Sequence, residues 1–313
     1  MSGIARAFAA AIVSALLTGS ILLFPASAAF PGGDGKIAYV LNAQIYTVNP
    51  DGSAKRRLTV DGSNAGPRWS PDGSRIAFTR TKNLYVMNAD GSGKRRVTAT
   101  GRDLQPAWSR DGRQLVFIRL QSNGRGDLFR IPASGGTARR LTSDAVSTGG
   151  NDRPTWSPTQ DMVLYLHYGH AGLQDAVIKT VDIATGRQRI VPAGVPNQQG
   201  DFVGAPDFAG DGQHILFLGF CTSSSALDCP PAGTHNVMRA DLIGTAREDL
   251  TGNSGIESSN DALDVAAAPS GEGFVIQGCF NFNIELEPPG YDFCGIRPGN
   301  VSNAHSADWQ ARR

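Results

Sequence analysis

Histidine, cysteine, serine and carboxylate side chains are the groups that could do chemistry in this chain, and their spacing matches no common catalytic motif. The sequence of 313 residues has five histidines, of which only His167 and His170 lie close together. A metal or general-base role would need such histidines to meet carboxylates around one cavity. The sequence contains no G-x-S-x-G, H-E-x-x-H, P-loop or EF-hand motif. We therefore expect no catalytic residue, no bound metal and no cofactor.

The elements that must position the polar residues belong to a sequence repeat. Residues 67–78, which begin Pro-Arg-Trp-Ser-Pro-Asp-Gly, recur at residues 106–117 and again, less completely, at 154–165. Two weaker copies follow at 206–217 and 267–276. The second half of the unit repeats as well, because residues 44–52 match residues 83–91, and each is followed by a pair of arginines and an apolar-Thr pair.

This unit predicts four short β-strands. Apolar and polar residues alternate with a period of two, and Asp-Gly pairs mark tight turns between the apolar runs. Units of four strands and about 40 residues are typical of propeller blades. The four tryptophans, Trp69, Trp108, Trp156 and Trp309, fall at one position of the unit, so we expect them to pack between neighbouring blades rather than to bind a ligand.

The two ends of the chain predict how the ring closes. Residues 34–40 resemble the second strand of a unit whose first strand is missing, and residues 307–310 resemble a first strand with nothing after it. Joining the two ends in one sheet would remove an exposed strand edge. We therefore predict an all-β protein, a six-bladed β-propeller of four-stranded antiparallel blades, whose C-terminal strand joins the N-terminal blade. Five or seven blades are the alternatives, because the fifth copy is weak.

In such a propeller, the loops before the tryptophans surround one mouth of the central channel. Polar side chains that converge there from several blades can form a binding site on a rigid scaffold. The alternative is ordinary solvated loop chemistry. A cation such as Ca²⁺ would suit the acidic side chains, but no motif supports one. The predicted binding residues are Asn64, Arg68, Asp103, Gln105, Asn151, Asp152, Arg153, Asp201, Asn260, Asp261, Asp264 and His305.

The first 29 residues have the features of a secretory signal peptide. Arg6 is the only charged residue before Asp34, an apolar stretch spans residues 7–24, and Ala26-Ser27-Ala28 offers small residues for cleavage. A retained membrane anchor is the alternative. We expect cleavage after Ala28 or Ala29, no further membrane span, and a single propeller domain over residues 30–313.

Four cysteines agree with export, because an even number in an exported chain suggests disulfides. We favour Cys221–Cys229 and Cys279–Cys294, since each pair brackets one local insertion. Free thiols are the alternative. The spacings do not resemble a zinc site.

Charge and composition exclude other classes of protein. The chain has 29 Lys and Arg against 28 Asp and Glu, a net charge of +1, so it lacks the basic field of a nucleic-acid-binding protein. Its 38 glycines and 18 prolines argue against a helical bundle. We expect a monomer that binds a protein or peptide partner.

The succession W-S-P-D-G, I-A-F, L-Y-V-M-N-A-D-G and R-R-L-T resembles the TolB-type, WD40-like β-propeller repeats over about residues 35–313. The resemblance implies a six-bladed propeller exported to the periplasm or the extracellular space. In the Tol–Pal system, the TolB propeller binds a peptidoglycan-associated lipoprotein. TolB also carries an N-terminal α/β domain, which we do not expect here.

We therefore expect a non-enzymatic, exported propeller that binds a protein or peptide partner at the cell envelope. The alternative is a secreted propeller enzyme, a polysaccharide lyase or hydrolase that acts at the channel mouth. Some oligogalacturonate lyases resemble this repeat and use a metal site with histidine ligands, which nothing in this sequence reproduces convincingly.

Overall fold

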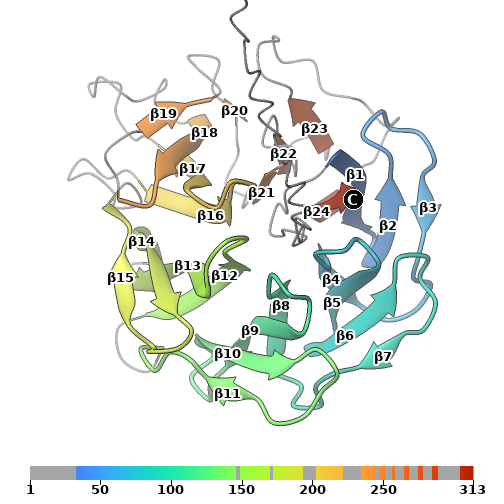
Figure 1. The fold of residues 1–313 in the computed structure, drawn as a ribbon, viewed down its shortest axis with the longest axis horizontal. Coiled ribbons are helices and arrows are strands. Elements are labelled where there is room, and N and C mark those ends of the chain that lie inside the picture. Colours follow the sequence, from blue (N-terminus) through green and yellow to red (C-terminus); the bar gives the residue numbers. More distant parts are fainter. Residues whose placement is uncertain are drawn as a thin grey trace, which may run out of the picture.

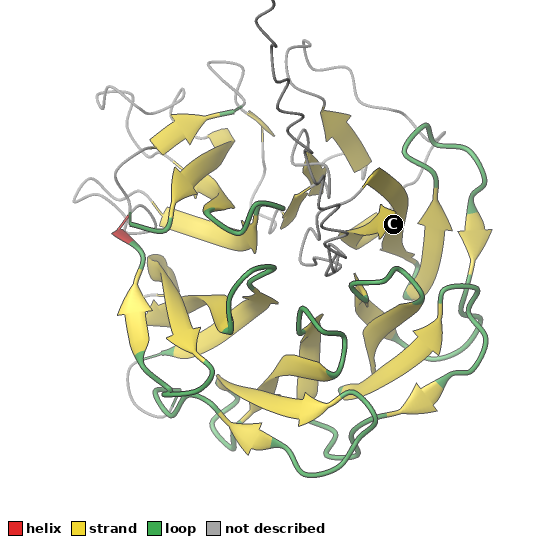
Figure 2. Ribbon diagram, viewed as in Figure 1, coloured by secondary structure: helices red, strands yellow, loops and turns green. Residues whose placement is uncertain are grey.

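Short antiparallel strands arranged around a common centre form this protein (Figure 1). A computed structural model of the chain describes residues 33–145, 149–169, 172–192, 202–220, 234–243, 247–250, 256–257, 264–267, 274–277, 284–287 and 304–312. Figure 2 shows that strands dominate this part of the chain. The predicted signal peptide and all four cysteines lie outside the described residues, so cleavage and the two disulfides stay predictions.

The two ends of the chain meet in one sheet, as predicted. The sheet has the strand order β24-β1-β2-β3, so the C-terminal strand is its innermost member. Ile37 of β1 pairs with Trp309 of β24, and Val40 pairs with His305. The strands of this blade are β1 (Gly33–Leu41), β2 (Gln44–Val48), β3 (Arg56–Arg57) and β24 (Ala304–Arg312).

The next three blades each contain four strands in chain order, with the first strand nearest the centre of the ring (Figure 1). The second blade has β4 (Asn64–Trp69), β5 (Arg75–Arg80), β6 (Asn83–Asn88) and β7 (Arg95–Arg96). The third has β8 (Asp103–Trp108), β9 (Gln114–Leu120), β10 (Gly126–Pro132) and β11 (Arg139–Arg140). The fourth has β12 (Gly150–Trp156), β13 (Met162–Gly169), β14 (Gly172–Asp182) and β15 (Gln188–Ile190).

The last third of the chain is less regular. One blade contains β16 (Phe202–Phe208), β17 (His214–Phe220), β18 (Thr234–Asp241) and β19 (Arg247–Asp249), and β20 (Ile256–Glu257) also pairs with β18. A short sheet of β21 (Asp264–Ala267), β22 (Phe274–Gln277) and β23 (Ile284–Glu287) follows. Strand β21 contacts both β16 and β24.

The prediction of six blades with four strands each is wrong. In the described part of the chain, five blades carry the full four-strand pattern, whereas the sheet β21–β23 has three strands. This sheet coincides with the weakest copy of the repeat, at residues 267–276, which lacks the tryptophan and the Asp-Gly turn of the early copies. The all-β propeller architecture itself is as predicted.

The core lies between neighbouring blades, and the tryptophans fill it. Trp108 packs with Ala77 and Leu84 of the preceding blade, and only 2% of its surface is exposed. Trp156 packs with Val116 and Ile118 in the same way. The predicted packing role is therefore confirmed for these two tryptophans. Large apolar rings buried at a repeated position hold successive sheets face to face.

Four inner strands share a local distortion that the sequence marks with proline. Gly66, Gln105, Arg153 and Ala205 have φ angles of 55°, 52°, 50° and 46°, and each precedes a proline. The pairing with the second strand shifts register at each of these positions. These β-bulges bend the innermost strand and re-aim the side chains beside it.

The positive φ at Gly66 predicts a cost for any side chain there. Gly66→Ala should lower the free energy of unfolding by about 1 kcal/mol, because L-residues are strained in the left-handed region. A Cβ at Gly66 would meet nothing closer than Gln105 Cα at 3.9 Å, so crowding does not contribute. Urea unfolding measures the change.

Gly204→Ala is the matched control, because Gly204 also has open space around it but has no positive φ. It should be neutral or slightly stabilising, since alanine reduces the freedom of the unfolded chain. Equal losses in the two variants would contradict the strain at Gly66.

Candidate functional site

The predicted binding residues lie on the inner strands that surround the centre of the ring (Figure 1). Asn64 and Arg68 belong to β4, Asp103 and Gln105 to β8, and residues 151–153 to β12. Asp264 begins β21 and His305 lies in β24, where the structure describes the backbone only. Asp201, Asn260 and Asp261 lie outside the described residues.

Two of these side chains are buried and hydrogen-bonded to other parts of the protein. Asn64 donates hydrogen bonds from Nδ2 to the carbonyl oxygens of Ala43 and Asp61, both at 2.9 Å. Asp103 is fully buried and accepts two bonds from Arg119, at 2.6 and 3.0 Å. Paired polar groups of this kind replace the water that burial removes. Asn64 thus connects the second blade to the first, and Asp103 is a structural residue within the third blade.

Asn151 occupies the equivalent place in the fourth blade and is also buried. Its Nδ2 donates to Thr142 Oγ1 at 3.0 Å and to Asp144 Oδ1 at 2.8 Å. His167 Nδ1 lies 2.7 Å from Asn151 Oδ1, and Lys179 Nζ lies 3.4 Å from Asp144 Oδ2. Asn151 therefore connects the loop before β12 to β13.

The pKa of Asp144 reflects this network. Burial would raise the pKa, but the hydrogen bond from Asn151 and the charges of His167 and Lys179 hold it below its usual value. Asp144 is thus a charged partner for the cations beside it.

The two histidines whose side chains the structure describes, His167 and His214, lie in different blades. His167 Nδ1 lies 3.5 Å from Asp144 in the fourth blade, while His214 Nδ1 lies 2.5 Å from Asp211 in the blade of β16–β19. His170 lies outside the described residues. Among the residues that the structure describes, no three His, Cys, Asp or Glu side chains come together as metal ligands.

The remaining predicted residues, Arg68, Gln105, Asp152 and Arg153, are half-buried at the inner strands. Gln105 Oε1 accepts a hydrogen bond of 3.0 Å from the backbone N–H of Arg153 in the next blade. The Gln105 N–H donates in turn to Thr79 Oγ1 at 3.0 Å. The bulges of β8 and β12 are thereby linked, and the side chain of Arg153 lies beside Asp152, with Nε 3.9 Å from Oδ2.

Two aspartates that sequence reasoning missed join further inner strands. Asp308 of β24 accepts a hydrogen bond of 2.5 Å from the Trp69 N–H of β4, and Arg68 Nη1 lies 3.9 Å from its other oxygen. Asp207 of β16 accepts one from Thr155 Oγ1 at 2.8 Å and one from the Ala267 N–H at 3.1 Å. Each directly precedes the aromatic residue of its copy of the repeat, Phe208 or Trp309. This shared position was the signal by which the sequence could have identified them.

Charge and burial oppose each other at Asp207. Burial raises the pKa of this carboxyl, while the positive charge of Arg68 and the hydrogen bonds from Thr155, Ala267 and Phe208 act to lower it. Arg68 also lies beside Asp308. The guanidinium of Arg68 in β4 therefore interacts electrostatically with carboxyls on two other inner strands, Asp207 of β16 and Asp308 of β24.

We predict that Asp308→Ala lowers the free energy of unfolding by about 1.5–3 kcal/mol, the range for a hydrogen bond to a charged group. The substitution leaves the Trp69 N–H without its acceptor. Asp308→Asn keeps one acceptor oxygen and should lower the free energy of unfolding by a smaller amount. Urea unfolding distinguishes the variants, and an Asp308→Ala variant as stable as wild type would contradict the bridge.

We also predict a pH signature for Asp207. Because its folded-state pKa is raised above the usual 3.8, the folded protein binds this proton more tightly than the unfolded chain does. The free energy of unfolding of wild type should therefore fall, relative to that of Asp207→Asn, as pH rises from 3.8 through the folded-state value. Parallel urea titrations from acid to neutral pH measure the difference, and a constant difference would contradict the raised pKa.

Several solved structures have a fold similar to that of this chain. Two solved structures titled as TolB are similar: that from Acinetobacter baumannii (TM-score 0.63, 16% identity, 89% of this chain and 67% of that chain) and the putative TolB from Agrobacterium tumefaciens (0.61, 18%, 88% and 97%). A chain of the nidogen/laminin complex also matches (0.67, 9%, 89% and 99%). At these identities, the likeness concerns the fold.

Sequence comparison gives the family. No curated protein is significantly similar in sequence. The family model of the TolB beta propeller domain matches residues 30–229, which is more than half of the chain. The repeat at residues 67–78 and its copies lie largely within the matched region. The chain therefore belongs to the TolB beta propeller domain family.

Proposed function

We propose that this protein is an exported, non-enzymatic propeller that binds a protein or peptide partner at the cell envelope. The observation that carries the proposal is the set of half-buried polar side chains on β8 and β12. Gln105, Asp152 and Arg153 lie on adjacent inner strands, and the Gln105–Arg153 bond fixes their bulges relative to one another. Polar groups held on a rigid scaffold recognise a partner with little loss of conformational freedom.

The contacts of the site favour binding over catalysis. Asp152 and Arg153 offer opposite charges side by side, at 3.9 Å, and such a pair can exchange its mutual contact for hydrogen bonds to a peptide backbone. His167 and His214, the two histidines with described side chains, lie in different blades. This arrangement gives no support to a lyase or hydrolase site.

The comparisons are consistent with this role. A similar fold occurs in a chain solved as part of the nidogen/laminin complex, whose title names two proteins. That likeness concerns the fold, and the partner of the present chain is proposed by chemistry alone, as a protein or peptide segment with polar groups.

Export rests on the sequence. The features of residues 1–29 and the even number of cysteines favour transfer to the periplasm or the extracellular space. In the described residues, no helix has the length and apolar character needed to cross a bilayer.

Affinity capture with site variants tests the proposal. The purified protein, immobilised, is incubated with envelope extract, and any recovered protein is then purified and titrated against wild type and Arg153→Ala. We predict that Arg153→Ala weakens binding about tenfold or more, as at a binding hot spot. Its backbone bond to Gln105 is kept, because alanine retains the N–H.

Arg56→Ala is the control, since Arg56 is an exposed residue of the outermost strand β3 and should leave the affinity unchanged. Equal loss in both variants would point to general charge attraction instead of this site. Recovery of no partner, together with cleavage of a polysaccharide by the protein, would overturn the proposal.

A further inference from the structure

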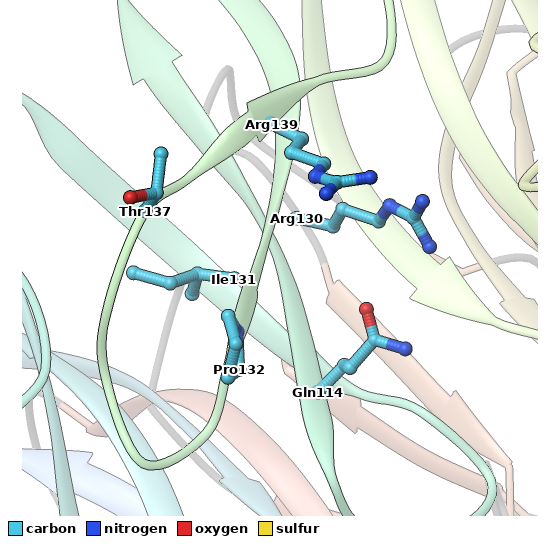
Figure 3. Close-up of a pocket in the computed structure, with 6 residues that line it drawn as sticks. All are labelled: Gln114, Arg130, Ile131, Pro132, Thr137 and Arg139. Carbon is cyan, nitrogen blue, oxygen red and sulfur yellow. The ribbon is translucent and has the colours of Figure 1, made fainter.

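A pocket on the third blade contains two arginines that the proposed partner site does not use. Its volume is about 390 Å³, within the lower part of the range for small-molecule sites. Arg130 of β10 and Arg139 of β11 are direct cross-strand partners. Figure 3 shows their side chains extending side by side, in the same direction. The lining residues are Gln114, Arg130, Ile131, Pro132, Thr137 and Arg139.

The repeat shows that this pair of like charges is unusual. At the same position of three other blades, an arginine of the outermost strand pairs with an uncharged residue of the third strand. In the blade of β16–β19, an arginine of the third strand pairs with a glutamate of the outermost strand. Like charges directly opposite each other in a sheet are destabilising. In the described blades, only the third places two arginines there; the equivalent pairs are Thr47–Arg56, Val86–Arg95, Thr180–Arg189 and Arg239–Glu248.

The Arg239–Glu248 pair indicates how this position is neutralised elsewhere. Arg239 Nη1 lies 4.0 Å from Glu248 Oε2, so a carboxylate supplied by the chain meets the guanidinium. In the third blade, the residue in the place of that glutamate is Arg139. Arg130 of the third blade therefore meets a second cation where Arg239 meets a carboxylate.

Neither arginine has a protein partner in the part of the chain that the structure describes. The neighbouring arginines do: Arg140 pairs with Asp127, and Arg95 donates to the Ala133 carbonyl oxygen at 2.6 Å. Two unpaired guanidinium groups at adjacent positions repel each other. An anion bound between them would remove this repulsion.

The pocket also limits the kind of anion. Val116, the cross-strand partner of Arg130, packs with Trp156 of the fourth blade, so Arg130 lies on the face that is turned toward that blade. The Gln114 amide lies on the same side as the two guanidinium groups (Figure 3). A phosphate monoester carries a charge of about −1.5 to −2 and three acceptor oxygens, enough to engage both arginines and a further donor.

We propose that this pocket binds the phosphate group of a small ligand, with Arg130 and Arg139 as its charged donors and Gln114 as a third. A carboxylate has two oxygens and one charge, so it would leave one guanidinium poorly matched. Pro132, which is exposed, supplies apolar surface for the remainder of the ligand, whereas Ile131 is buried against the second blade. The site is separate from the proposed partner site on β8 and β12, and either can fail without the other.

Binding of inorganic phosphate and of glycerol 1-phosphate to the purified protein tests the proposal. Isothermal titration calorimetry at constant ionic strength should give saturable binding of both to wild type, and weaker binding of acetate, a monocarboxylate. Arg130→Thr, which introduces the residue found at this position in the first and fourth blades, Thr47 and Thr180, should weaken phosphate binding about tenfold or more, the loss expected for a hydrogen bond to a charged group.

Arg139→Glu copies the Arg239–Glu248 pair and should abolish phosphate binding without lowering the melting temperature, because it replaces a repulsion by an attraction. Arg56→Ala, the equivalent outer-strand arginine of the first blade, is the matched control and should bind phosphate as wild type does. Thermal unfolding of each variant shows that it is folded.

Three results would overturn the proposal. They are absence of saturable phosphate binding to wild type, acetate binding as tightly as phosphate, and phosphate affinity that is unchanged by Arg130→Thr and Arg139→Glu. If glycerol 1-phosphate binds more tightly than inorganic phosphate, a phosphorylated small molecule is the ligand; if the two bind equally, free phosphate is sufficient.

Discussion

The ring depends on satisfying the free edge of each innermost strand. One edge of such a strand pairs within its own blade, and its other edge lies toward the centre of the ring, where its backbone groups need partners. Asp207 and Asp308 supply acceptors to the Ala267 and Trp69 N–H groups across two boundaries between blades. Blades are therefore joined by side-chain hydrogen bonds at the centre, in addition to the apolar core between their faces.

The bulges explain why polar side chains can occupy the centre without weakening the sheets. A residue with positive φ followed by proline interrupts the ladder at one point and lets pairing resume two residues later. Gln105 uses the interruption to accept the Arg153 N–H of the next blade. The same distortion thus supplies both a connection between blades and the side chains that we propose as a partner site.

The sequence predicted those features that repeat and missed those that depend on cross-strand register. Alternating strands and tight turns follow from residues within a few positions of one another, and the pairing of the chain ends follows from the incomplete repeat unit at each end. The structural roles of Asn64 and Asp103 could not be predicted, because Ala43 belongs to the neighbouring blade and Arg119 lies opposite Asp103 on the next strand of its sheet. The pairing of Arg130 with Arg139 was missed for the same reason, and the weak fifth copy misled the blade count.

The β24–β1 pairing has a consequence for how the chain folds during synthesis. Strand β24 follows all the other strands in the sequence, and it supplies the innermost strand of the blade that begins with β1. Until the ribosome has made it, β1 has one edge without a partner, and the hydrophobic face around Ile37 has no cover from that side. The nascent protein is thus open to aggregation for most of its translation, and binding by a chaperone would protect it until the ring is sealed.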